Sequence, residues 1–152
     1  MFRKILVCLD GSEFSEQILP YVSKEAAGTG KTVILMRVVP TSFGSMVTAA
    51  GVISSTPMMP PTEEQLASEE KEARSYLNGK MKALQSTGID VMCFVIAGNP
   101  GEEILSYAHK SECDLIAIAT HGRGGIRRAI FGSVAEHIIK NSRLPILLIK
   151  PK

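Results

Sequence analysis

The sequence has no tryptophan, only three cysteines among 152 residues, and a net charge of only +2. Cys8, Cys93 and Cys113 each lie in an apolar run without CxxC spacing, so they predict reduced core residues and not a disulfide framework or a metal site. A nucleic-acid footprint needs clustered basic residues as well as positive charge. The small net charge therefore gives no reason to expect nucleic acid as a partner.

Long apolar runs are also missing. No run reaches the roughly 18–20 apolar residues of a membrane span, and the stretch of about six near the N-terminus is too short for a signal peptide. Reduced core thiols fit the cytosol. We therefore expect a cytoplasmic protein without a membrane partner.

The sequence does have enough length and apolar content for one core. Its 152 residues are 45% hydrophobic and 21% charged, which is ordinary for a globular protein. A chain of this size buries roughly 68–70% of its unfolded surface. Because no repeat or domain boundary is visible, we expect a single domain over residues 1–152.

Strand and helix patterns alternate along the chain. Five short apolar runs, rich in β-branched residues or leucine, predict strands at Lys4–Leu9, Thr32–Val39, Ile89–Ala97, Leu115–Ala119 and Pro145–Ile149. Between them, helical patterns cover Phe14–Ala27, Thr62–Leu84, Pro100–Lys110 and Gly132–Asn141. This order predicts the α/β class, with a doubly wound five-stranded parallel sheet and helices on both faces.

Local signals mark where two helices begin. Thr62 and Gln65 form a capping-box pattern, and Asn99 followed by Pro100 is typical of a helix start. Pro20 indicates a kink inside the first helix.

The stretch at about 41–61 fits neither pattern. It contains glycine, proline, serine and methionine without a period, and it is longer than a compact domain usually needs. It is either a flexible insert beside the sheet or a lid or partner-docking loop.

One phosphate-loop candidate fails on its context. Gly28–Thr32 ends like a Walker A motif, but the first glycine of that motif would fall at Glu25. The segment also leaves a helix and enters a strand, which is the reverse of a P-loop. A helix end followed by a turn is the better interpretation.

The segment after the strand Leu115–Ala119 has the right context. His121–Gly125 is rich in glycine, and Gly132 and Ser133 open the last helix after a basic stretch. Small residues let backbone N–H groups approach phosphate oxygens, and a helix start adds orphan N–H groups and the positive end of its dipole. Ser133 either caps the helix or bonds a terminal phosphate.

Gly122 is followed by nine residues and then by Gly132 and Ser133. This spacing resembles the motif G-x2-G-x9-G-[ST] of the ATP-binding branch of the universal stress protein family. The opening KILVCLDGSEFSE, the run VILMRVVP and the closing GSVAEHIIKNSRLPILLIK also resemble that family, so the likeness spans the chain. It implies a Rossmann-like, adenine nucleotide alpha hydrolase-like fold that binds ATP. Ala119 replaces the motif's first glycine, which costs about 1 kcal/mol or more if φ is positive there.

The resemblance implies nucleotide contacts at the carboxyl ends of the strands, where doubly wound sheets bind ligands. Asp10 matches the family's acidic residue near the ribose and adenine; the alternative is a cap or turn residue before the first helix. Val38 matches the position whose backbone holds the adenine edge; the alternative is an ordinary strand residue. The expected contacts are Leu9, Asp10, Val38, Ala119, His121, Gly122, Arg123, Gly132, Ser133 and Val134.

None of these residues predicts catalysis. His121 matches a position inside the family's phosphate loop, and no nucleophile or acid accompanies it in sequence, so phosphate contact or loop architecture is favoured over general-base work. No spacing suggests a transition-metal site. A Mg²⁺ ion accompanying ATP would be held mainly by phosphates and water.

The last apolar run also predicts a partner. Residues 145–150 are expected at the sheet edge, and a bare edge is an aggregation hazard unless it is paired or covered. In the resembling family this strand pairs with its counterpart across a two-fold axis, which implies a homodimer.

Three functions remain. The favoured one is an ATP-binding regulatory or sensor module in the stress response. The second is an enzyme, either a slow ATPase or an adenylyl- or phosphoryl-transferring relative; a transferase needs a second substrate pocket, which only the insert at about 41–61 could build. Ala119 alone favours a nucleotide-free dimer that acts through protein contacts.

Overall fold

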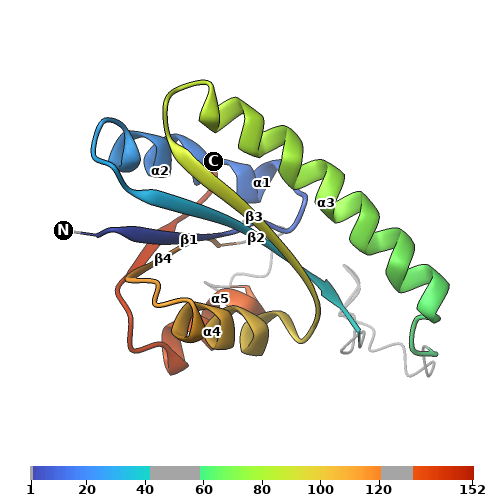
Figure 1. The fold of residues 1–152 in the computed structure, drawn as a ribbon. Helices are drawn as coiled ribbons and strands as arrows, with labels where there is room; N and C mark the ends of the chain where they lie inside the picture. Colours follow the sequence, from blue (N-terminus) through green and yellow to red (C-terminus); the bar gives the residue numbers. More distant parts are fainter. Residues whose placement is uncertain (1, 42–58, 121–131) are drawn as a thin grey trace.

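The computed structural model describes residues 2–41, 59–120 and 132–152. Along these ranges the elements follow in the order β1 (Lys4–Cys8), α1 (Glu13–Glu16), α2 (Leu19–Ala26), β2 (Thr32–Pro40), α3 (Glu63–Gln85), β3 (Asp90–Gly98), α4 (Pro100–Lys110), β4 (Leu115–Ala119), α5 (Ser133–Asn141) and β5 (Ile146–Ile149) (Figure 1). All five predicted strands are present, and the α/β class is confirmed.

The strands form one parallel sheet in the order β3-β2-β1-β4-β5. The central strand β1 pairs on both sides, with Ile5 opposite Val33 of β2 and Leu115 of β4. The chain therefore builds outward to β3 on one side and then returns to add β4 and β5 on the other. The order reverses between β1 and β4, which confirms the doubly wound topology.

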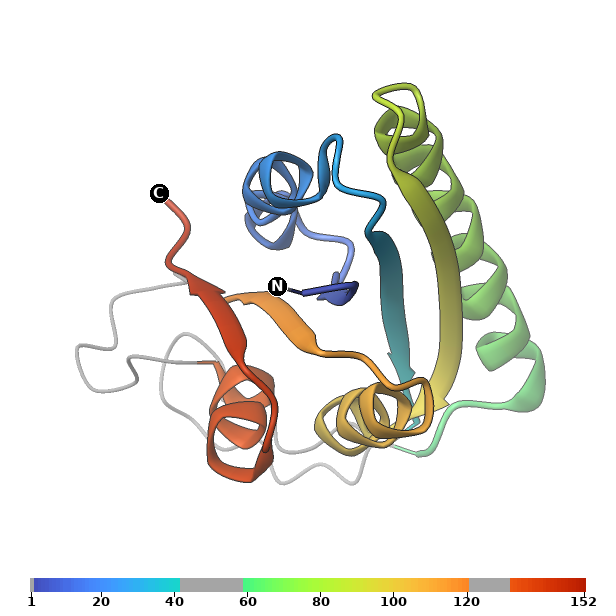
Figure 2. The same ribbon diagram turned by 60° about the vertical axis from the view of Figure 1, so that its left-hand side comes forward.

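Helices cover both faces of the sheet because alternate strand residues point to opposite sides. Ile5 and Val7 pack with one buried cluster, which also contains residues of α2 and α3. Leu6 and Cys8 pack with the other, which contains residues of α4 and α5. Figure 2 shows these helix groups on opposite sides of the strands. Full burial of one aliphatic side chain contributes about 1.5–3 kcal/mol, so these two layers stabilise the fold.

Side-chain caps fix the starts of α3 and α4 as the sequence predicts. The backbone N–H of Thr62 donates to Gln65 Oε1 at 2.8 Å, and the N–H of Gln65 donates to Thr62 Oγ1 at 3.2 Å. At α4, Asn99 Oδ1 accepts from the N–H of Glu102 at 3.3 Å. Both caps satisfy backbone donors that have no partner within the helix.

The prediction of one kinked helix over Phe14–Ala27 is wrong. The segment forms two helices, α1 and α2, and Pro20 lies in the first turn of α2. Proline has no N–H and its ring clashes with the preceding turn, so it fits a helix start better than a helix interior. The chain then leaves α2 through Gly28, whose φ of +66° favours glycine.

The cysteines occupy the core as expected: Cys8 and Cys113 are buried, Cys93 is half-buried, and all three are free thiols. No helix in the described ranges is long and apolar enough to cross a bilayer. Most of the predicted insert at 41–61 lies outside the described residues.

Candidate functional site

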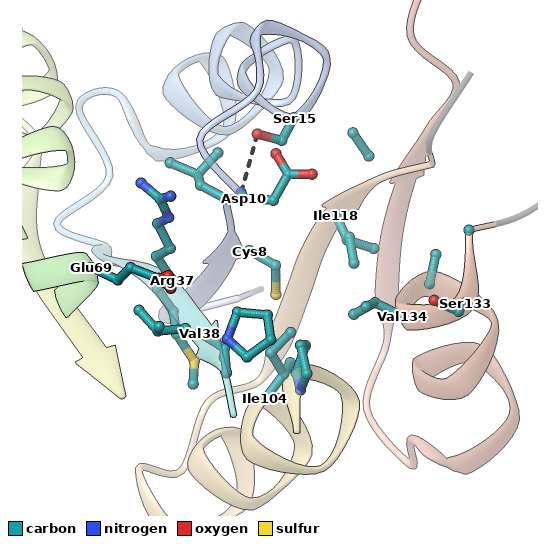
Figure 3. Close-up of a pocket in the computed structure, with 18 of the residues that line it drawn as sticks. Cys8, Asp10, Ser15, Arg37, Val38, Glu69, Ile104, Ile118, Ser133 and Val134 are labelled. Carbon is teal, nitrogen blue, oxygen red and sulfur yellow. Dashed lines mark hydrogen bonds between the residues drawn. The ribbon is translucent and has the colours of Figure 1, made fainter. Parts of the chain in front are cut away.

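A pocket of about 650 Å³ opens at the carboxyl ends of the strands, where the strand order reverses (Figure 3). Its walls come from the ends of β1, β2 and β4, the starts of α4 and α5, and one side of α3. Ligands of doubly wound sheets bind at this kind of position, and the volume lies within the usual range for small-molecule sites.

The pocket gathers most of the residues predicted to contact a nucleotide. Those that line it are Leu9, Asp10, Val38, Ala119, Gly132, Ser133 and Val134. The other three, His121, Gly122 and Arg123, lie outside the described residues. Segments more than a hundred positions apart in sequence thus line one pocket, because parallel strands end at the same edge of the sheet.

The loop from β1 to α1 holds Asp10 in a fixed orientation. Asp10 Oδ1 accepts from the N–H of Ser12 at 2.8 Å and from its hydroxyl at 2.6 Å. The N–H of Asp10 donates to Ser15 Oγ at 3.3 Å, and Ser15 is buried. Ser12, not Asp10, is the cap of α1, since its hydroxyl oxygen accepts from the N–H of Ser15 at 3.1 Å. Asp10 is therefore a turn residue, with its exposed carboxyl group at the pocket.

The start of α5 faces the same pocket without a side-chain cap. Gly132 is the N-cap residue, and no side chain there bonds the first turn. Of the two roles considered for Ser133, the helix cap is excluded, because Ser133 is already the first helical residue and is exposed. The first backbone N–H groups of a helix have no partner within it, and the dipole adds positive potential there. This helix start is suited to an anion.

Ala119 is not strained. It is the last residue of β4, it is buried, and it pairs with Ile149 of β5. Among the described non-glycine residues, only Glu112 has a positive φ. Because Ala119 has an ordinary strand conformation, the missing glycine carries no backbone penalty at this position.

The floor of the pocket is apolar. Met36, Ile104 and Ile118 line it together with Cys8. Burial, and secondarily the nearby Cys113 thiol, raises the pKa of Cys8 from 9.0 to about 12. The Cys8 thiol therefore stays protonated at neutral pH and acts as a small apolar side chain, since only the thiolate is a nucleophile.

The sequence did not predict the charged residues that line the pocket near α3. Arg37, Glu69 and Glu72 line it, and Figure 3 shows Arg37 and Glu69 on the same side as Asp10. The sequence held one signal, the single charge of Arg37 within the apolar run of β2. Nothing in the sequence places α3 over the strand ends, so the two glutamates could not be found this way.

The described lining suits binding more than acid–base chemistry. It offers an apolar slot, one ordered carboxylate at Asp10 and the backbone donors at the start of α5. A ligand with a flat apolar ring, a hydroxylated middle and an anionic end matches these three surfaces.

Comparisons with known proteins identify the family of this chain. The model of the universal stress protein family matches residues 1–150. Universal stress protein MJ0577 of Methanocaldococcus jannaschii is 29% identical over 160 residues, which cover 100% of this chain and 97% of that protein. Universal stress protein MJ0531 of the same organism is 30% identical over 155 residues, which cover 99% of this chain and 83% of that protein.

Solved structures show the same fold. The structure of MJ0577 has a TM-score of 0.80 and 28% identity, and the match covers 100% of this chain and 98% of that one. A universal stress protein in complex with cAMP has a TM-score of 0.66 and 16% identity, covering 97% and 96% of the two chains. An Arabidopsis thaliana family member with AMP bound has a TM-score of 0.65 and 12% identity, covering 99% and 92%. The Rossmann-like fold is confirmed.

Proposed function

The chain belongs to the universal stress protein family, and we propose that it binds an adenine nucleotide, in the first place ATP, as a regulatory or sensor module of the stress response. One observation carries the proposal. The ordered carboxylate of Asp10 and the uncapped start of α5 line the same pocket, across an apolar floor. Hydrogen-bond acceptors for a sugar and donors for phosphates thus lie at separate places in one site.

The nucleotide is proposed to lie across these two places. The sugar half of the site consists of Asp10–Ser15 with Arg37, and Asp10 accepts hydrogen bonds from the ribose hydroxyls there. The phosphate half consists of Gly132–Val134, whose backbone N–H groups donate to phosphate oxygens. The backbone of Val38 holds the adenine edge, with Leu9 beside it, and the base packs on Met36 and Ile104.

Two kinds of support come from outside this chain. Structures with the same fold hold AMP and cAMP, which share adenine, ribose and a phosphate. The second is the family's motif, which this chain matches at Gly122, Gly132 and Ser133, with Ala119 in place of the first glycine. His121 and Arg123 belong to the same proposed phosphate contact, and a Mg²⁺ ion would be held mainly by the phosphates and water.

Identification of the molecule released by denaturing the purified protein tests the proposal. We expect an adenine nucleotide, detected by mass spectrometry, in amounts that approach one per chain, or uptake of added ATP by protein purified without it. Folded protein that retains no nucleotide and gives no binding heat with ATP, ADP or AMP would contradict it.

The nucleotide-free alternative rests on Ala119 alone. The strand conformation of Ala119 removes the backbone penalty that favoured this alternative. Dedicated catalysis, whether adenylyl transfer or hydrolysis, has no described residue in its favour, and we propose a cytoplasmic binding module.

We also propose a homodimer through residues 145–150. In the described sheet β5 pairs with β4 only, and all four of its residues are half-buried within a single chain. An isologous pair of β5 strands would cover this edge. Light scattering at micromolar concentration should give the mass of two chains, and the mass of one chain would contradict the dimer.

A further inference from the structure

Arg37 is a charged residue in a strand that is otherwise apolar apart from its first residue. It lies on β2 between Met36 and Val38, it is half-buried, and it lines the pocket. Figure 3 shows its side chain rising from β2 toward the loop that carries Asp10. Its position beside the sugar half follows from the strand register, which brings the end of β2 next to the end of β1.

Two contacts hold the guanidinium group in place without using its N–H groups. Its Cζ lies 5.4 Å from the centre of the Tyr76 ring. A Cβ at Gly11, where φ is +87°, would lie 3.0 Å from the Cζ and Nη1 of Arg37, so the loop packs directly on the guanidinium. The group is therefore ordered by a ring on α3 and by the residue that follows Asp10.

The donors of Arg37 have no acceptor in the described part of the chain. Neither a hydrogen bond nor an ion pair joins its guanidinium to another described residue, although its five N–H groups are strong donors. A half-buried, ordered guanidinium that lines a pocket is suited to meet acceptor atoms of a ligand.

The charges around Arg37 decide which acceptor fits. Asp10, Glu69 and Glu72 line the same side, so carboxylates outnumber the one described cation of the lining. A further phosphate on the sugar would face these carboxylates and be repelled. A hydroxyl group fits better, because its oxygen accepts from the arginine while its hydrogen donates to a carboxylate.

We propose that Arg37 is a specificity-determining residue which, together with Asp10, makes the site select ribonucleotides over 2′-deoxyribonucleotides. The Arg37 guanidinium donates to a ribose hydroxyl oxygen, and Asp10 accepts from a ribose hydroxyl. This assignment rests on the proposed function and deepens it by naming the group that sets sugar selectivity. Tyr76 acts as a positioning residue, because its ring holds the guanidinium.

Calorimetric titration with ATP and 2′-dATP tests the assignment on wild type, Arg37→Met and Arg74→Met. Arg74 lies exposed on α3 and is the matched control for the loss of one positive charge. Wild type should prefer ATP at least tenfold. Arg37→Met should lose about tenfold in ATP affinity and keep its 2′-dATP affinity within about twofold, and Arg74→Met should behave as wild type.

The outcomes separate this inference from the proposed function. A folded wild type that binds neither nucleotide overturns both. Equal affinity for ATP and 2′-dATP, or an Arg37→Met variant that weakens both equally, overturns the sugar contact and leaves nucleotide binding intact. Tighter binding of adenosine 2′,5′-bisphosphate than of AMP overturns the charge argument and assigns Arg37 to a phosphate.

A second pair of variants tests the positioning by Tyr76. Tyr76→Phe keeps the ring beside Arg37, whereas Tyr76→Leu removes it. The ratio of ATP to 2′-dATP affinity should persist in Tyr76→Phe and fall severalfold in Tyr76→Leu, with folding checked by circular dichroism. A merely structural role would leave the ratio unchanged in both variants, and that result would overturn the positioning.

Discussion

The two halves of the pocket are built in opposite ways. Five hydrogen bonds join Asp10, Ser12 and Ser15 in the sugar half. In the phosphate half, Gly132 gives the start of α5 no side-chain cap. Within the described residues, side chains order the acceptor groups of the sugar half, whereas no side-chain cap orders the donors at the start of α5.

A bulky acidic side chain in the phosphate half should lower ATP affinity more than any other change. Gly132→Glu places a side chain and a negative charge where the phosphates are proposed to approach, so ATP affinity should fall more than a hundredfold. Calorimetry measures the change. Gly79→Glu is the matched control, because a Cβ at Gly79 meets nothing within 4 Å on the exposed side of α3. Equal affinity in the two variants would show that phosphates do not bind at α5.

Removal of the Asp10 carboxylate from the sugar half should lower ATP affinity by a smaller factor. Asp10→Ala deletes a charged hydrogen-bond acceptor worth about 1.5–3 kcal/mol, so ATP affinity should fall about 10- to 100-fold. The affinity for 2′,3′-dideoxy-ATP should change little, because that ligand lacks both hydroxyls. A loss that is as large for the dideoxy ligand would place the ribose elsewhere.

The buried Cys8 thiol at the floor of the pocket predicts a pH effect on stability. Because the pKa of Cys8 is raised to about 12, the folded state keeps this proton while the unfolded state loses it above pH 9.0. Unfolding is therefore favoured as the pH rises, and wild type should lose about 1.4 kcal/mol more than Cys8→Ala between pH 8 and 10. Denaturant unfolding at both pH values measures this difference. Parallel losses in the two proteins would show that the Cys8 thiol is hydrated.

Loss of the Tyr76–Glu16 hydrogen bond, the tie between α3 and α1, should have the smallest effect. The Tyr76 hydroxyl donates to Glu16 Oε1 at 2.9 Å, and burial together with this bond raises the pKa of Tyr76. Tyr76→Phe should lower the free energy of unfolding by about 1 kcal/mol. Chemical denaturation measures this free energy, and Tyr21→Phe at an exposed position of α2 is the control. No difference between the two variants would mean that the tie adds nothing to stability.

The sequence predicts the sheet better than it predicts the site. Apolar runs identify all five strands, and their parallel order follows from the alternation with helices. The break between α1 and α2 was missed because Pro20 is compatible with a kink and with a helix start. The sequence leaves two roles open for Ser133, and only the backbone shows that the helix already includes it and that Gly132 is the N-cap.

The part of the site that depends on strand ends could be predicted from the sequence. The part that depends on packing between helices and strands could not. Asp10, Val38 and Ala119 follow from the rule that ligands bind beyond the carboxyl ends of strands. Glu69 and Glu72 line the pocket only because α3 packs beside these strand ends, and that packing depends on tertiary contacts with no local signature.

An ATP titration of ¹⁵N-labelled protein, followed by its amide resonances, tests whether one nucleotide occupies both halves of the pocket. We expect chemical-shift changes in both halves at once, at Asp10–Ser12 and at Ser133–Ala135, with the larger changes at the start of α5. Shifts confined to one half, or centred on the opposite end of the sheet near Lys31, would contradict it.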